Sequence, residues 1–145
     1  MVSLIRYDTQ TFDIVFVNTV SDNTYQAHSI LAISINEVIY SFKTNNSTTH
    51  HLVKASLTPP TDPTSDPNYS LDEAEHKSID GDSTHGSISR LSHDNATLWH
   101  AVNLDNTVTY FQLNLDDFTL NGSARHLDST INNGGLSMEV SEEVV

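Results

Sequence analysis

Hydrophobic and polar residues alternate along most of this chain with a period of two. In segment 25–35 the odd positions, among them Leu31, Ile33 and Ile35, share one side. In 37–42, Val38, Tyr40 and Phe42 alternate with neighbours on the other side. Successive side chains of a β-strand point to opposite faces, whereas a helix needs a stripe with a period of 3.6, and no stripe of three helical turns occurs. The pattern therefore predicts a chain built of strands.

We expect eight or nine short strands joined by polar turns, many of them rich in β-branched and aromatic residues. Such a series predicts an all-β fold: a single antiparallel β-sandwich, jelly roll or small β-barrel. The 145 residues fit one domain, 1–145. The segments with the strongest strand character are 11–20, 25–35, 37–42, 51–57, 87–91, 97–103, 107–115 and 136–140.

Segment 58–86 interrupts this series and reads as a long insert rich in Pro, Asp and Ser. All four prolines lie between Pro59 and Pro67, and proline can neither complete a β-ladder nor continue a helix. Within the insert, Ser70 followed by Glu73 matches a capping box, which predicts one or two turns of helix there. We expect the rest to form an excursion loop, mobile or without chemistry of its own.

The charge balance narrows the choice of partners. Lys and Arg total 6 against 19 Asp and Glu, for a formal net charge of −13. Six scattered cations form no patch for nucleic-acid phosphates, and an anionic membrane surface is disfavoured for the same reason. No apolar run approaches the roughly 20 residues that span a bilayer. The N-terminus lacks the features of a signal peptide, so the compartment stays open between cytoplasmic and secreted. An acidic surface suits a neutral or basic ligand.

Cofactor and metal motifs are missing from the sequence. There is no cysteine, no glycine-rich phosphate loop and no His-Glu-x-x-His, so we expect neither a nucleotide cofactor nor a metal. Eight histidines nevertheless stand out. His50 and His51 are neighbours on a strand and should face opposite sides, while His100 shares a face with Leu98 and Val102 and should point inward. His100 is then either a core residue bonded to backbone or a residue that contacts a ligand or acts as an acid–base group.

Polar loops and two aromatic residues are the other candidates. Trp99, the only tryptophan, and Tyr110 could form a stacking surface for a sugar ring. Asp116 and Asp117 could bind calcium, hydrogen-bond sugar hydroxyls, supply a general base or solvate a turn. The candidate ligand-binding residues are Trp99, Asn103, Asp105, Asn106, Tyr110, Asp116, Asp117 and Asn121.

Segment 97–140 is similar to a repeat of cyanovirin-type lectins in the spacing of its polar and glycine residues: Asn103 to Asn106, Asn114 to Asp117 and Gly134-Gly135. The similarity covers under a third of the chain, and the cysteines often found in that family are absent. It implies glycan binding.

Three classes of function remain. The first is a non-enzymatic, lectin-like module that binds a glycan or another small neutral ligand through its loops. The second is a small β-barrel enzyme, a hydrolase, isomerase or cyclase, with a His–carboxylate pair in an internal cavity; its candidate residues are His100, Asp117 and His28. The third is a structural protein that forms homo-oligomers through its sheet edges. Convergent histidines and carboxylates around a cavity would favour the enzyme.

Overall fold

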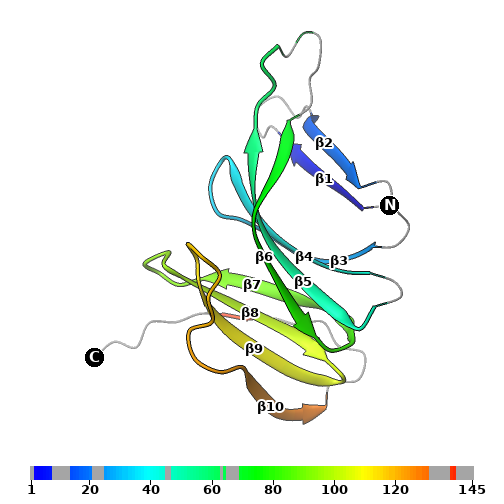
Figure 1. Cartoon of the computed structure of the whole chain (residues 1–145), viewed down its shortest axis with the longest axis vertical. Coiled ribbons are helices and arrows are strands. Elements are labelled where there is room, and N and C mark those ends of the chain that lie inside the picture. The colour runs from blue at the N-terminus through cyan, green and yellow to red at the C-terminus, as the bar shows by residue number, and fades with distance from the viewer. Residues whose placement is uncertain are drawn as a thin grey trace.

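A computed structural model describes residues 2–7, 14–20, 25–44, 47–62, 64, 69–130 and 138–139. Within these ranges the chain is all-β: it forms two antiparallel sheets of four strands each and one two-stranded hairpin (Figure 1). The prediction of an all-β chain is confirmed. The ten strands of the described ranges exceed the eight or nine expected.

The first sheet has the order β3-β4-β5-β6, so each strand pairs with its neighbour in sequence. This meander is the simplest antiparallel arrangement, because short connections join adjacent strands. Its strands are β3 (Tyr25–Ala32), β4 (Glu37–Thr44), β5 (Thr49–Thr58) and β6 (Ser70–Asp80).

The second sheet has the order β10-β9-β8-β7 and is also a meander. Its strands are β7 (Ser83–Leu91), β8 (Thr97–Leu104), β9 (Thr107–Asn114) and β10 (Arg125–Thr130). The hairpin of β1 (Val2–Tyr7) and β2 (Ile14–Val20) is a separate sheet that contacts β3.

The segment 58–86 differs from its prediction. Ser70–Asp80 is strand β6, paired with β5 apart from a bulge at Ala74, and β7 begins at Ser83. The predicted helix at Ser70 is therefore wrong, and no helix occurs in the part of the chain that the structure describes. Residues 59–69 lie between β5 and β6, and of these the structure describes 59–62, 64 and 69. The capping-box pattern is local, whereas the half-buried Glu75, Lys77 and Ile79 alternate with exposed neighbours, which matches a strand.

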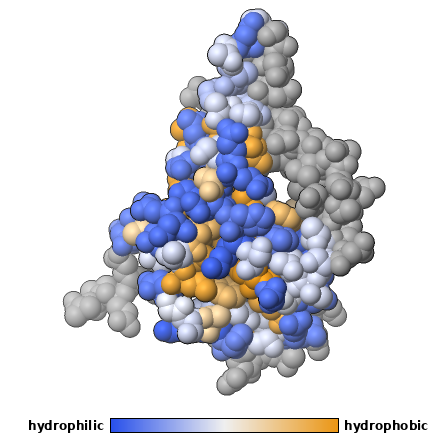
Figure 2. All heavy atoms as spheres, in the orientation of Figure 1, coloured by the Kyte–Doolittle hydropathy of each residue, from blue (hydrophilic) through white to orange (hydrophobic). Residues whose placement is uncertain are grey.

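The hydrophobic core lies between the two four-stranded sheets. Ile39 and Leu52 from the first sheet belong to one buried cluster with Leu98, Val102 and Phe111 from the second. Figure 2 shows the described residues of one face as largely hydrophilic, with hydrophobic patches over both sheets. Burying these faces against one another is the main stabilising term of the fold.

A tight corner joins the sheets. Gly81, at φ +134°, lies between β6 and β7, and a Cβ there would approach Leu104 Cβ to 3.1 Å. Glycine is required because a side chain has neither the conformation nor the space. Asp82 forms an ion pair with Lys43 on β4, and its backbone N–H donates to the Asp105 carboxylate at 3.0 Å.

The described residues contain no helix that could cross a membrane.

Candidate functional site

A row of polar side chains crosses the core from one sheet to the other. His50 on β5 and His100 on β8 have no exposed surface, and their Nε2 atoms lie 2.9 Å apart. Ser83 Oγ lies 3.3 Å from Nδ1 of His50, and Ser89 Oγ lies 2.9 Å from Nδ1 of His100. We call these four residues the buried histidine row. Every ring nitrogen in it has a partner, as burial requires.

The buried histidine row is uncharged at neutral pH. Burial, together with the neighbouring His100 and His28, lowers the pKa of His50 to about 2. Burial, with His28 nearby, lowers the pKa of His100 to about 3. Removing a charge from water disfavours the charged imidazolium, and two imidazolium groups in contact would also repel. The short contact between the two Nε2 atoms therefore carries a single hydrogen.

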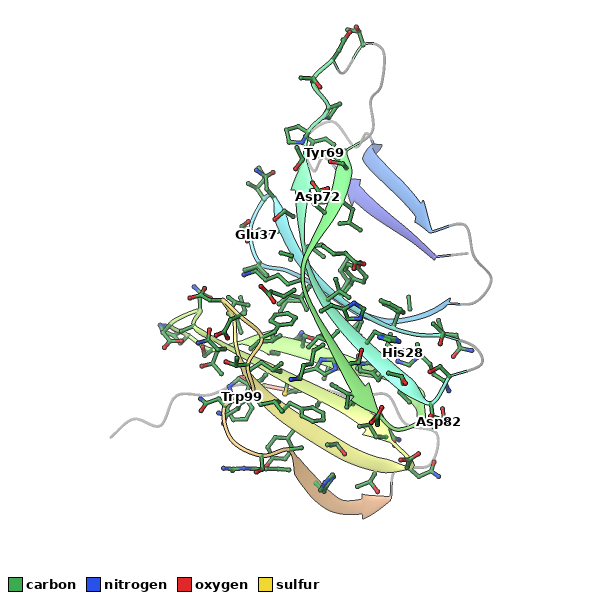
Figure 3. All side chains as sticks on the ribbon, viewed as in Figure 1. His28, Glu37, Tyr69, Asp72, Asp82 and Trp99 are labelled. Atoms are coloured by element: carbon green, nitrogen blue, oxygen red, sulfur yellow. The ribbon has the colours of Figure 1, made fainter. Side chains whose placement is uncertain are left out.

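His28 extends this cluster along β3. Its ring stacks on His50, with centroids 5.4 Å apart, and Figure 3 shows it on the side of the second sheet that faces the first. Burial, with Lys43 nearby, lowers the pKa of His28. Its Nδ1 is buried and has no hydrogen-bond partner within the described ranges.

A second group of polar side chains joins the two sheets beside the buried histidine row. The hydroxyls of Ser29, Ser41 and Ser87 form a closed triangle: Ser29 and Ser87 both lie 2.6 Å from Ser41, and Ser87 donates to Ser29 at 3.0 Å. These serines come from β3, β4 and β7. Each hydroxyl can donate once and accept once around the triangle, so all three are satisfied.

The outer face of the first sheet holds a second pair of histidines. His51 Nδ1 lies 3.0 Å from His76 Nε2, and the ring of His51 stacks on Phe42 at 4.8 Å. Tyr40 donates to Glu73 at 2.8 Å, and Glu73 lies 3.9 Å from His76 Nδ1. Burial and His76 lower the pKa of His51, whereas Glu73 opposes that change. His50 and His51 thus face opposite sides, as predicted.

On the outer face of the second sheet, Trp99 contacts one other aromatic ring of the described residues. Trp99 on β8 and Tyr110 on β9 have centroids 6.3 Å apart and planes tilted by 31°. Both side chains are half-buried. Trp99 lies on the opposite side of the sheet from His28 (Figure 3). It alternates with the buried Leu98 and His100, so it faces away from the core.

Strand register surrounds these rings with polar side chains. Trp99 pairs directly with Arg90 on β7 and with Gln112 on β9. Tyr110 pairs directly with Arg125 on β10. Directly paired residues of an antiparallel sheet lie on the same face, about 5 Å apart. We call Trp99, Tyr110, Arg90, Gln112 and Arg125 the aromatic platform.

The predicted loop residues do not gather at one place. Asp105 and Asn106, at φ 49° and 64°, form the tight turn between β8 and β9. Positive φ at both positions is typical of a type I′ hairpin turn, which Asn and Asp tolerate. Asn103 is buried.

The remaining loop candidates lie at the other end of the same hairpin. Asp117 accepts hydrogen bonds from the backbone and hydroxyl of Thr119, and these bonds lower the pKa of Asp117. The backbone N–H of Asp116 donates to Asn114, and Asn121 is exposed. These contacts stabilise a turn. The eight residues of β9 separate the two ends of the hairpin by a distance of about 25 Å.

Of the three residues predicted for an enzyme, the structure brings two together. The ring of His28 stacks on His50, and Nε2 of His100 lies 2.9 Å from Nε2 of His50. Both residues lower the pKa of His50, so the three histidines belong to one buried cluster. Asp117 is exposed and bonded to Thr119. The hydrogen-bond partners of the buried histidine row are serines and histidines, and none is a carboxylate.

Sequence reasoning missed His50, Ser83 and Ser89 in the core and Arg90, Gln112 and Arg125 on the platform. Alternation alone signals that His50 faces inward, but its partner His100 comes from a different sheet. No group of three or more His, Asp or Glu suited to a metal ion is found among the described residues.

Comparisons with known proteins place the chain in no family. No protein-family model matches it, and neither a curated protein sequence nor a solved structure matches it. The similarity of segment 97–140 to cyanovirin-type lectins therefore gains no support from them.

Proposed function

We propose that this protein is a non-enzymatic carbohydrate-binding module and that the aromatic platform is its binding surface. The observation that carries the proposal is the contact of Trp99 with Tyr110, 6.3 Å between centroids, on a sheet face turned away from the core. The apolar face of a sugar ring packs well on an aromatic ring, and the polar edge of the sugar then needs hydrogen-bond partners.

The surroundings of the two rings supply those partners. Gln112, cross-strand from Trp99, offers both a donor and an acceptor to sugar hydroxyls. The rings stand on the central strands β8 and β9, which hold them more rigidly than a loop would. The proposal thus keeps Trp99 and Tyr110 from the predicted set and moves the site from the loops to the sheet.

The finer architecture belongs to the same proposal. We propose that the two four-stranded sheets form a β-sandwich, because one cluster of buried side chains draws on both of them. This arrangement leaves each sheet one outer face, and the platform occupies the outer face of the second sheet.

Binding can be read from the protein's own fluorescence. Trp99 is the only tryptophan, so a sugar that stacks on it changes the sole indole signal. We expect a panel of immobilised oligosaccharides to give binders, and the substitution Trp99→Leu to lower their affinity at least about tenfold, or about 1.4 kcal/mol.

The matched control is Phe42→Leu, which removes an aromatic ring from the outer face of the other sheet. It should leave sugar affinity unchanged. If no oligosaccharide binds, or if Phe42→Leu abolishes binding while Trp99→Leu does not, the proposed function is wrong.

A further inference from the structure

We infer that the aromatic platform selects sugars that carry a carboxylate. This inference rests on the proposed function and goes beyond the neutral ligand expected from the sequence. It starts from the placement of positive charge: two of the six Lys and Arg residues of a chain with net charge −13 lie on this one face.

The two arginines stand on opposite sides of the rings. Arg90 is cross-strand from Trp99 on β7, and Arg125 is cross-strand from Tyr110 on β10. The strands β7 and β10 are three spacings apart, about 14 Å. A short oligosaccharide lying across the platform would therefore meet a guanidinium on each side of its stacked ring.

Within the described ranges these arginines have no acidic partner. No carboxylate of the described residues forms an ion pair with Arg90 or Arg125, and both side chains are exposed. Arg90 Nη1 donates to the carbonyl of Ser89 at 3.0 Å, which holds the guanidinium near the sheet. By contrast, Lys43 is paired with Asp82, and Lys54 donates to the Leu115 carbonyl at 3.0 Å.

The chemistry of arginine favours a carboxylate ligand. A guanidinium presents parallel N–H donors that match the two oxygens of a carboxylate, and such charge-assisted bonds are about twice as strong as neutral ones. The overall negative charge disfavours a long polyanion, because the rest of the protein repels it. A short acidic oligosaccharide satisfies both conditions.

The test compares two ligands that differ at their carboxyl groups: a trimer of galacturonic acid, which is charged, and its trimethyl ester, which is not. Isothermal titration calorimetry measures the affinity of the protein for each trimer, because the Trp99→Leu variant has no indole to report binding. We expect the acid to bind about tenfold more tightly than the ester, and 500 mM NaCl to remove most of that difference by screening.

Three variants locate the effect. Arg90→Gln and Arg125→Gln should each weaken binding of the acid about fivefold and leave the ester unchanged. Lys77→Gln is the matched control: it removes the same charge from β6, in the other sheet, and should leave both affinities unchanged.

The outcomes separate this inference from the proposed function. If acid and ester bind equally, and Trp99→Leu weakens both, the carboxylate preference is wrong and the sugar platform stands. If the acid binds more tightly but neither arginine variant affects it, the inference is also wrong. If neither trimer binds, nor any sugar of the panel, both proposals fail.

Discussion

Two neighbouring residues, His50 and His51, show how one residue type takes two roles. His50 lies in the core, bonded to His100 and Ser83, with its pKa lowered to about 2. His51 lies on the outer face, beside His76 and Phe42, with a carboxylate near enough to oppose the lowering of its pKa. The alternation of a strand alone separates them. A histidine pair in the core is thus part of the fold's stability, whereas the same pair outside contributes little.

The largest expected effect comes from breaking the buried pair. His100→Ala leaves a cavity and removes partners from His50 and Ser89, so we expect the free energy of unfolding to fall by about 3 kcal/mol. His76→Ala, the matched change in the outer pair, should cost no more than about 0.5 kcal/mol. Urea denaturation followed by circular dichroism measures both. Equal costs would show that burial does not distinguish the two pairs.

A smaller effect should follow acidification. An unfolded histidine binds a proton below about pH 6.5, whereas His50 and His100 in the folded protein do so only near pH 2 to 3. The unfolded state therefore gains protons first. Stability is complete about one pH unit above 6.5 and declines below it, by roughly 2.5 kcal/mol for the pair between pH 7 and pH 5.5.

Urea denaturation at several pH values tests this dependence. His93→Gln removes an exposed turn histidine and should leave the slope unchanged, whereas the double variant His50→Gln/His100→Gln should flatten it. A wild-type stability that stays constant from pH 7 to pH 5 would contradict a neutral buried pair.

The smallest effect concerns the serine that lies within hydrogen-bond distance of one histidine in each histidine pair. Ser89→Ala leaves the buried Nδ1 of His100 without a partner and should cost about 1 to 2 kcal/mol. Ser78→Ala removes a hydroxyl 3.3 Å from Nδ1 of the partly exposed His51, where water can replace it, and should cost under about 0.5 kcal/mol. Thermal unfolding of the two variants gives the comparison. A larger loss for Ser78→Ala than for Ser89→Ala would reverse it.

Alternation was enough to predict the orientation of particular side chains. It placed His100 inward with Leu98 and Val102, and all three are buried. It placed Trp99 on the other face, where it contacts Tyr110. These outcomes depend only on the period of a strand, which is a local property.

Predictions that needed register or packing did less well. Ser70 and Glu73 satisfied a local helix rule, but pairing with β5 made this segment a strand. The contact of His50 with His100 depends on how two sheets meet, 50 residues apart in sequence. Arg90 joins Trp99 only because of the register between β7 and β8, which no composition reveals.

The row Ser83–His50–His100–Ser89 has one more consequence. If the hydrogen between the two Nε2 atoms belongs to His50, that ring accepts from Ser83, and His100 donates to Ser89; if it belongs to His100, every bond reverses. The interior therefore holds two tautomeric arrangements with the same heavy-atom positions and opposite polarity. Nitrogen-15 chemical shifts of the two rings would report which direction the native protein prefers, and how evenly it divides between them.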